Sequence, residues 1–316
     1  MAITLKKLSE REERFLSGHR ACPGCAAPIA LRQILLAIEY PVVVTCATGC
    51  MEVVSTIYPY TAWGCSFLHN AFENSAATAS GIETAYRALK KKGKIKDEIK
   101  FVAIGGDGGT FDIGLQSLSG AMERNHNLLY VCYNNEAYMN TGIQRSSATP
   151  RGASTTTAPA GTVIPGKTQP SKDLTGIIAA HNIPYAAQAS PHDWRDLITK
   201  VNTAVNTQGA SFINVLAPCH RGWRTKMEES IEIARLAVET CFWPLYEVID
   251  GEYKINYIPK EKLPVTEYIT KQGRFEHLKR PENAHIVEAL QRDVDTKWAH
   301  LLRLSEKPQP TSEEIA

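Results

Sequence analysis

The fold of this chain is decided by two short segments, GGDGG at residues 105–109 and YNNEAY at residues 133–138. Each follows an apolar run of strand length, residues 99–104 before the first and residues 128–132 before the second. Continuous apolar runs are typical of strands buried on both faces of a parallel sheet, and such sheets bind ligands where their strands end. The pattern predicts an α/β fold with a mostly parallel sheet, and it places both segments at the ligand-binding edge.

The polar residues of these segments suit a cation that is shared with a phosphate. Asp107 offers a carboxylate at one strand end and Asn135 a carboxamide at the next. Mg²⁺ takes oxygen ligands in near-octahedral geometry and usually shares them with substrate phosphates. Gly106 and Gly108 let the backbone approach a phosphate, and the following helix directs its N-terminus at that charge. Either segment alone is also typical of a turn, but their joint position predicts a metal-bridged diphosphate site.

The pairing of the two segments resembles the thiamine diphosphate motif, in which Gly-Asp-Gly is followed a few tens of residues later by Asn-Asn. The resemblance implies that Asp107 and Asn135 bind Mg²⁺ through their side chains. It implies that Ala137 binds the same ion through its backbone carbonyl.

Cysteines provide a second signal. The N-terminus is charged and has no apolar segment of the secretory kind, so we expect a reducing cytosol, where grouped cysteines more often bind metal than form disulfides. Cys22 and Cys25 form a CxxC turn, and Cys50 and Cys219 each follow a predicted strand. Four such thiolates suit a [4Fe–4S] cluster or a structural zinc ion.

The other cysteines have a simpler interpretation. We expect Cys132 and Cys241 to be small core residues and Cys46 to be buried in its strand. Cys65 remains without an assignment.

Taken together, these segments resemble the beta subunit of multi-subunit 2-oxoacid:ferredoxin oxidoreductases of the pyruvate synthase type, to which the oxalate oxidoreductase beta subunit is closely related. The resemblance extends from about residue 17 to about residue 246. It rests on six blocks in the expected order: residues 18–25, 47–50, 69–74, 105–108, 135–142 and 217–223.

The resemblance implies a thiamine-diphosphate-binding α/β fold, with helices on both faces of the sheet, and a full set of site residues. Asn140 would reach the reacting end of the substrate. The expected [4Fe–4S] ligands are Cys22, Cys25, Cys50 and Cys219. The expected residues around thiamine diphosphate and Mg²⁺ are Gly106, Asp107, Gly108, Asn135, Ala137 and Thr141.

The implied reaction is oxidative decarboxylation of a small 2-oxoacid, with electrons passing through the cluster to ferredoxin and coenzyme A or water releasing the product. Alpha and gamma subunits, with delta as a further candidate, would complete the enzyme. The resemblance places the carboxylate that activates the cofactor on another subunit. Glu73 is the nearest candidate in this chain, and helix capping or packing suits it better. We therefore expect this chain to be inactive alone.

The sequence says little about the substrate. Pyruvate is the first expectation and oxalate the second, because Arg151 follows Asn140 and Arg145 closely and could bind a further carboxylate. A surface position for Arg151 is the alternative. Two other classes of function also remain open: a non-oxidative thiamine enzyme whose cysteines hold zinc, and a metal-stabilised interaction module without catalysis.

Composition sets the remaining limits. The chain has 316 residues and 43% hydrophobic content, enough for one large core, and its net charge of +2 gives no basic field for nucleic acid. No apolar run approaches the roughly 18 residues of a membrane helix, so we expect a cytoplasmic protein.

The chain divides into two expected parts. Residues 1–242 form the cofactor and cluster domain, and residues 243–316 form an extension that packs on it or on a partner subunit. The extension begins with a hairpin candidate at residues 245–257 and contains one helix at about residues 281–303. The Thr-, Gly- and Pro-rich segment 146–171 is long enough to be a functional loop.

Overall fold

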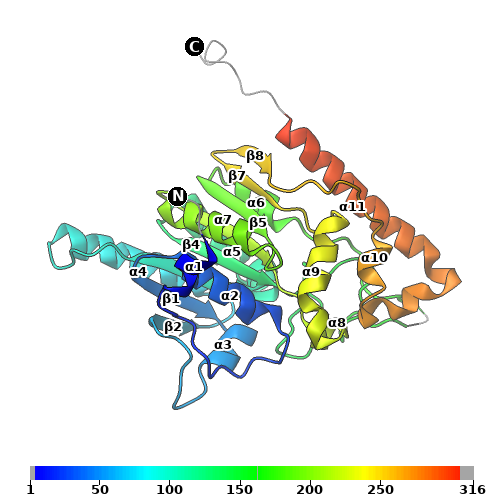
Figure 1. Ribbon diagram of the computed structural model, residues 1–316, viewed down its shortest axis with the longest axis horizontal. Helices are drawn as coiled ribbons and strands as arrows, with labels where there is room; N and C mark the ends of the chain where they lie inside the picture. Colours follow the sequence, from blue (N-terminus) through cyan, green and yellow to red (C-terminus); the bar gives the residue numbers. More distant parts are fainter. Residues whose placement is uncertain (1–3, 162, 307–316) are drawn as a thin grey trace, which may run out of the picture.

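A mixed sheet of eight strands forms the centre of the protein (Figure 1). The computed structural model describes residues 4–161 and 163–306. The strand order is β2-β1-β3-β4-β6-β5-β7-β8, in which all pairs up to β5 are parallel and the last two are antiparallel. The strands are β1 (Val42–Ala47), β2 (Ser66–Asn70), β3 (Lys100–Gly106), β4 (Leu129–Asn134), β5 (Tyr185–Ala189), β6 (Ser211–Leu216), β7 (Tyr246–Ile249) and β8 (Glu252–Ile255). The expected α/β fold is confirmed.

Helices cover both faces of this sheet, which explains the continuous apolar runs of its central strands. Val102 and Ile104 of β3 point to one core, and Phe101 and Ala103 point to the other, because successive side chains of a strand alternate between faces. The first core is closed mainly by α2 (Ala26–Ala37) and α7 (Trp194–Asn206). The second is closed by α4 (Ser75–Lys91), α5 (Leu115–Glu123) and α6 (Leu174–Ala179).

The C-terminal part builds a third core beside the sheet. Its helices are α8 (His220–Trp223), α9 (Ser230–Glu239), α10 (Thr266–Ile269) and α11 (Ala284–Ser305), together with 3-10 turns at Met227–Glu229, Gly273–Lys279 and Pro281–Asn283. The predicted hairpin is confirmed as β7 and β8. Asp250 and Gly251 connect them at φ of 49° and 86°, as the twist of a tight hairpin requires. The hairpin extends the sheet, and Leu301 of α11 reaches the second core.

Two elements differ from the expected ones. The helix expected from residue 70 begins at Ser75, and residues 66–70 form the edge strand β2, whose exposed side chains give no apolar run. The helix expected from Asp112 is preceded by a π-helical turn at Gly108–Ile113, directly after Asp107. Short π-helical segments often lie at functional sites.

The remaining short helices are α1 (Leu5–Ser9) and α3 (Cys50–Ser55).

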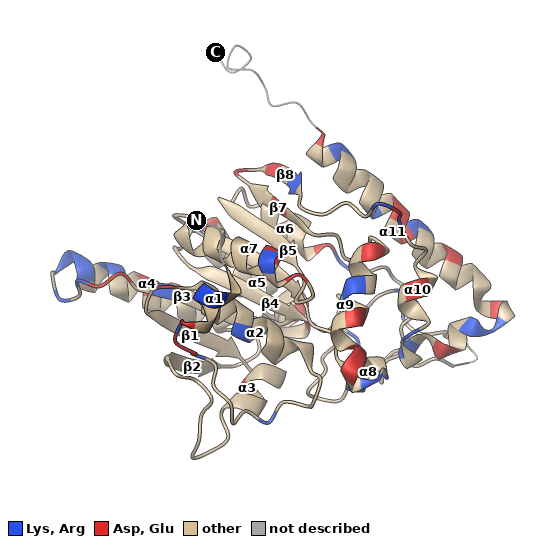
Figure 2. Ribbon diagram, viewed as in Figure 1, with Lys and Arg blue, Asp and Glu red and all other residues tan. Residues whose placement is uncertain are grey.

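Charged residues are distributed without one dominant face. Basic residues gather at the far end of α4, whereas basic and acidic residues alternate along α9 and α11 (Figure 2). Within the described ranges, no helix combines the length and apolar character that crossing a membrane requires.

Candidate functional site

The two glycine- and asparagine-containing segments meet at the carboxyl ends of the strands, as predicted. β3 and β4 pair directly, with Gly106 opposite Tyr133, so Asp107 and Asn135 follow at the same edge. A small pocket there collects six residues of the predicted set: Gly106, Gly108, Asn135, Ala137, Asn140 and Thr141. Asp107 lies fully buried beside it.

The three residues implied as Mg²⁺ ligands converge on one point. One terminal atom of the Asn135 carboxamide lies 2.9 Å from the Ala137 carbonyl oxygen and 3.0 Å from Asp107 Oδ1. Without a cation, the amide nitrogen occupies this position and donates to both oxygens. A cation bound here would need the amide oxygen in this position, which a rotation of the amide would supply.

Burial dominates the electrostatics of Asp107. Removal from water raises the pKa of its carboxyl to about 8. Ser146 Oγ donates to Oδ2 at 2.5 Å and the Asn135 backbone N–H donates to Oδ1 at 3.1 Å, and both bonds oppose this rise. A cation at this point would favour the ionised form. Ser146 was not singled out from the sequence, where the only signal was the length of the loop that contains it.

Aromatic rings restrict the pocket. A Cβ atom at Gly108 would lie 2.4 Å from the Tyr138 ring, so only glycine fits below that ring. The Phe72 ring lies 6.2 Å from the same ring, between centroids. The remaining cavity is about 20 Å³, so a diphosphate reaches the Gly108 backbone only if Tyr138 moves away.

Contacts from the C-terminal part, outside the sheet, hold the segment that carries Asn135 and Ala137 in place. Glu136, between them, has a left-handed φ of 64°, which is unfavourable for a residue with a side chain and needs support from its surroundings. Its carboxylate pairs with Arg274 at 2.5 Å. The Arg274 guanidinium lies 4.1 Å from the centroid of the Trp223 ring, and the Trp223 indole N–H donates to the Asn135 carbonyl at 2.8 Å.

This support is buried and charged. Glu136 and Arg274 are 2% and 3% exposed. Burial raises the pKa of Glu136, and the charge of Arg274 opposes that rise. Arg274 was not singled out from the sequence, because a separation of 138 residues from Glu136 leaves no local pattern.

The four predicted cluster ligands come to one region. The charges of Cys22, Cys25 and Cys219 each act on Cys50, which places the four cysteines in the same part of the molecule. A hydrogen bond of 3.3 Å from the Ala26 N–H to the Pro218 carbonyl joins the two chain segments beside Cys25 and Cys219. Cys50 also lines the small pocket with Asn135 and Ala137. The cysteine region and the diphosphate edge are therefore adjacent.

The cysteines nevertheless do not form a closed metal site. Among the described residues, no group of three or more His, Cys, Asp or Glu side chains is arranged to hold a metal ion. Burial raises the pKa of Cys25 to about 12 and raises the pKa values of Cys50 and Cys219 as well. Burial therefore favours the protonated form of these three thiols, so a metal or cluster bound by them would have to displace their protons.

The remaining cysteines behave largely as expected. Cys46, Cys132 and Cys241 are buried, which confirms their assignment to the core. Cys241 lies just after α9 rather than within a helix. Cys65 is partly buried before β2, and burial raises its pKa to about 11.

The expectation that Arg151 binds a substrate carboxylate is corrected. Arg151 Nε donates to Asp293 of α11 at 2.7 Å, and its Nη1 donates to the Thr168 carbonyl. It does not line the small pocket. Asn140 and Thr141 do line it and are exposed, and Thr141 also hydrogen-bonds to Gln144 at 2.6 Å.

Comparison with known proteins agrees with this geometry. Residues 44–215 match the family of thiamine pyrophosphate enzymes, in its C-terminal TPP-binding domain. The chain is 51% identical to pyruvate synthase subunit PorB of Thermotoga maritima, over 97% of this chain and 98% of that protein. It is 45% identical to ketoisovalerate oxidoreductase subunit VorB of Pyrococcus horikoshii, over 93% and 94%.

A solved structure shares the fold. It is a 2-oxoglutarate:ferredoxin oxidoreductase from Magnetococcus marinus, with a TM-score of 0.55 and 18% identity over 74% of this chain and 84% of that chain. Sheet, strand-end pocket and sequence match together define a thiamine-diphosphate-binding fold. Within that class, the chain belongs to the family of 2-oxoacid:ferredoxin oxidoreductase beta subunits, which are oxidoreductase subunits.

The Arg274 network yields a first prediction. Arg274→Met leaves the Glu136 carboxylate buried without its partner, which we expect to lower the free energy of unfolding by about 3–5 kcal/mol. Because Glu136 lies between Asn135 and Ala137, retention of thiamine diphosphate should fall as well. Thermal unfolding and cofactor content of the purified protein measure both effects.

The control for this prediction is Arg280→Met, which changes an exposed arginine of the same segment and should alter neither quantity. Adding Glu136→Gln to Arg274→Met should restore part of the stability, because it removes the unpaired charge. Equal stability of the Arg274 and Arg280 variants would show that the buried pair does not support the site.

Proposed function

We propose that this chain is the beta subunit of an enzyme that oxidatively decarboxylates a small 2-oxoacid, pyruvate first, and passes the electrons through a [4Fe–4S] cluster to ferredoxin. The observation that carries the proposal is the position of Cys50. It lines the same pocket as Asn135 and Ala137, and Cys22, Cys25 and Cys219 lie close enough to act electrostatically on it. Cofactor and cluster would therefore be neighbours, which suits electron transfer between them.

Mg²⁺ fits the ligand set at the strand ends. Two octahedral ligands about 2.1 Å from Mg²⁺ and at right angles lie about 3 Å from each other. The Asn135 amide atom lies 2.9 Å from the Ala137 carbonyl oxygen and 3.0 Å from Asp107 Oδ1. These distances support Asp107, Asn135 and Ala137 as three ligands of one ion. Phosphate oxygens and water would complete the shell.

Thiamine diphosphate, when bound, supplies the carbanion chemistry of the reaction. The residues of this chain hold and orient it. Asp107 and Asn135 would hold the diphosphate through Mg²⁺, and the backbone at Gly106 and Gly108 would border it. Ser146 holds the Asp107 carboxylate in place. Asn140 is exposed at the pocket rim, a position from which it can contact a substrate.

The four cysteines are proposed as the cluster ligands. Their positions near the starts of α2, α3 and α8 are set by the ends of neighbouring strands and by the CxxC turn. Insertion of the cluster would ionise the thiols, whose pKa values burial raises, and would draw them into a closed arrangement.

Other subunits are needed on this proposal. The described residues around the pocket supply oxygen ligands and aromatic rings, and the carboxylate that activates the cofactor ring would come from a partner. Relatives of this chain are named as subunits of pyruvate synthase and of a ketoisovalerate oxidoreductase. We therefore propose alpha and gamma subunits as partners and an inactive isolated chain, in the cytoplasm.

Pyruvate is favoured over oxalate as substrate. The argument for oxalate was a second cation at Arg151, and Asp293 occupies that guanidinium. The chain is 51% identical to a pyruvate synthase subunit and 45% to a ketoisovalerate oxidoreductase subunit, so a branched 2-oxoacid is the main competitor.

The second prediction tests the diphosphate site. Asp107→Asn removes the charged Mg²⁺ ligand and should greatly weaken retention of thiamine diphosphate without unfolding the chain. Asn135→Ala should act in the same direction but more mildly, because water replaces a neutral ligand more readily. Cofactor content after gel filtration measures the effect, and Asp97→Ala, at an exposed aspartate, is the control. Full cofactor occupancy in both site variants would place the diphosphate elsewhere.

The third prediction tests the cluster. Replacing Cys22, Cys25, Cys50 or Cys219 with serine should lower iron content and abolish ferredoxin reduction. Cys241→Ser should leave iron unchanged, because that thiol is a core residue. Iron analysis and visible absorption of anaerobically purified complex measure this. Stoichiometric zinc without iron, or equal iron loss in the Cys241 variant, would contradict the assignment.

The fourth prediction concerns the substrate. In steady-state assays of the assembled complex, kcat/KM should be highest for pyruvate among pyruvate, oxalate, glyoxylate, 2-oxoglutarate and 2-oxoisovalerate. The isolated chain should show no activity. A clear preference for 2-oxoglutarate or for the branched 2-oxoacid would refute the substrate assignment while leaving the cofactor and cluster assignments open to their own tests.

A further inference from the structure

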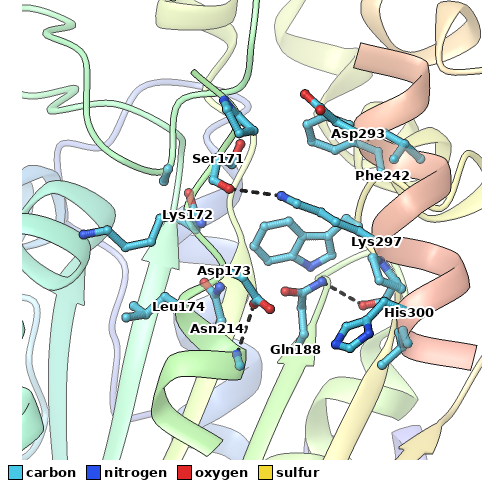
Figure 3. Close-up of a pocket in the computed structure, with 18 of the residues that line it drawn as sticks. Ser171, Lys172, Asp173, Leu174, Gln188, Asn214, Phe242, Asp293, Lys297 and His300 are labelled. Atoms are coloured by element: carbon cyan, nitrogen blue, oxygen red, sulfur yellow. Dashed lines mark hydrogen bonds between the residues drawn. The ribbon is translucent and has the colours of Figure 1, made fainter. Parts of the chain in front are cut away.

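A second cavity lies away from the cofactor pocket, between α6, α11 and the β5–β8 end of the sheet (Figure 3). Its volume is about 520 Å³, which is in the range of sites that bind small molecules. None of its lining residues lines the cofactor pocket. The established family and the proposed reaction assign it no role.

The two cavities lie on opposite sides of the chain that leaves β4. Asn135 and Ala137 line the cofactor pocket, whereas Asn134 and Glu136 line the second cavity. The left-handed backbone conformation of Glu136, just after β4, turns its side chain away from the cofactor pocket. The second cavity is therefore a neighbour of the cofactor pocket and separate from it.

Apolar side chains form most of the walls. α11 contributes Leu290, Val294 and Leu301, α6 contributes Leu174 and Ile177, and the aromatic lining comprises Phe111, Phe242, Trp243, Tyr246 and Tyr253. Such walls favour an occupant with an aromatic or aliphatic body.

One polar group in the floor has no partner. Asn214 of β6 is 3% exposed, and its Nδ2 donates to Thr175 at 3.3 Å, but its Oδ1 has no hydrogen bond. The neighbouring Gln188 is bonded at both ends, to Pro244 and to Thr175. A buried acceptor without a donor costs about 1–3 kcal/mol. The floor thus offers one acceptor to an occupant that carries a donor.

One lysine of the wall has no ion-pair partner among the described residues. Lys297 extends from α11 across the cavity, and its Nζ donates to the Ser171 carbonyl at 3.1 Å (Figure 3). Within the described ranges it forms no ion pair, whereas Arg151 and Lys172 in the same lining pair with Asp293 and Asp112. The apolar surroundings lower the pKa of Lys297 by desolvation, a penalty that a bound anion would offset.

The other ionisable groups of the lining have partners of their own, and the Asp173, Asp293 and Glu136 carboxylates still act electrostatically on Lys297. The Asp173 carboxylate accepts from the Gly176 N–H at 3.0 Å and so caps α6. Glu136 pairs with Arg274. His300 lies one turn after Lys297 on α11 and also faces the cavity (Figure 3).

We propose that this cavity is a binding site for a small organic acid that has an aromatic or aliphatic body and a hydrogen-bond donor at its far end. The carboxylate pairs with Lys297, the body packs between α6 and α11, and the donor bonds to Asn214 Oδ1. Each part of this ligand matches one feature of the cavity: the charge of Lys297, the free acceptor of Asn214 and the apolar walls.

The experiment is calorimetric titration of the assembled complex with p-hydroxyphenylpropionate, which carries all three parts. Phenylpropionate lacks the donor and p-hydroxyphenylpropanol lacks the charge, so each should bind about tenfold more weakly, the equivalent of one lost hydrogen bond or ion pair. Lys297→Met should weaken binding of p-hydroxyphenylpropionate to a similar extent. Ile177→Trp should abolish it by filling the cavity.

Lys260→Met is the matched control, because it removes an exposed lysine outside the cavity, and it should leave binding unchanged. If Lys297→Met fails to fold, Ile177→Trp and the two comparison compounds still decide. Absence of binding at millimolar concentration would overturn the proposal. So would equal affinity for the three compounds, or binding that survives Ile177→Trp.

Discussion

A carboxylate buried at the end of β3 sets the main constraint on this structure. Asp107 is withdrawn from water, and its charged form is costly unless hydrogen bonds or a cation compensate. The Ser146 hydroxyl and the Asn135 N–H provide the hydrogen bonds, and both come from distant parts of the chain. The paths of β4 and of the loop after it are therefore tied to this one side chain, and a metal-bridged diphosphate is the occupant that the arrangement best suits.

The same constraint explains the role of the C-terminal part. For the Asn135 amide and the Ala137 carbonyl to face Asp107, Glu136 between them adopts a left-handed backbone conformation and turns its side chain away. Arg274 forms an ion pair with the Glu136 carboxylate, and the Trp223 indole N–H donates to the Asn135 carbonyl. Trp223 also follows Cys219 by one turn of α8. The C-terminal part thus supports the cofactor edge and the cysteine region through the same few contacts.

The two regions differ in how complete they are within this chain. At the cofactor edge, the Asn135 amide already lies 2.9 Å from the Ala137 carbonyl oxygen and 3.0 Å from Asp107 Oδ1. The cysteines lie in one region but, among the described residues, are not arranged to hold a metal ion. Burial favours the protonated form of Cys25. On the proposed function, an ion at the cofactor edge would require the Asn135 amide to rotate, whereas a cluster would have to displace the protons of its thiol ligands.

Local patterns in the sequence determined the sheet, the strand-end position of Asp107 and Asn135, and the grouping of four cysteines. Apolar runs mark buried parallel strands, whose carboxyl ends must share one edge. Only the tertiary structure decided the contacts between distant positions: Ser146 with Asp107 over 39 residues, Arg274 with Glu136 over 138, and Arg151 with Asp293 over 142. It also decided that exposed residues 66–70 form a strand. Those outcomes depend on which surfaces meet after folding, and no short stretch of sequence contains that information.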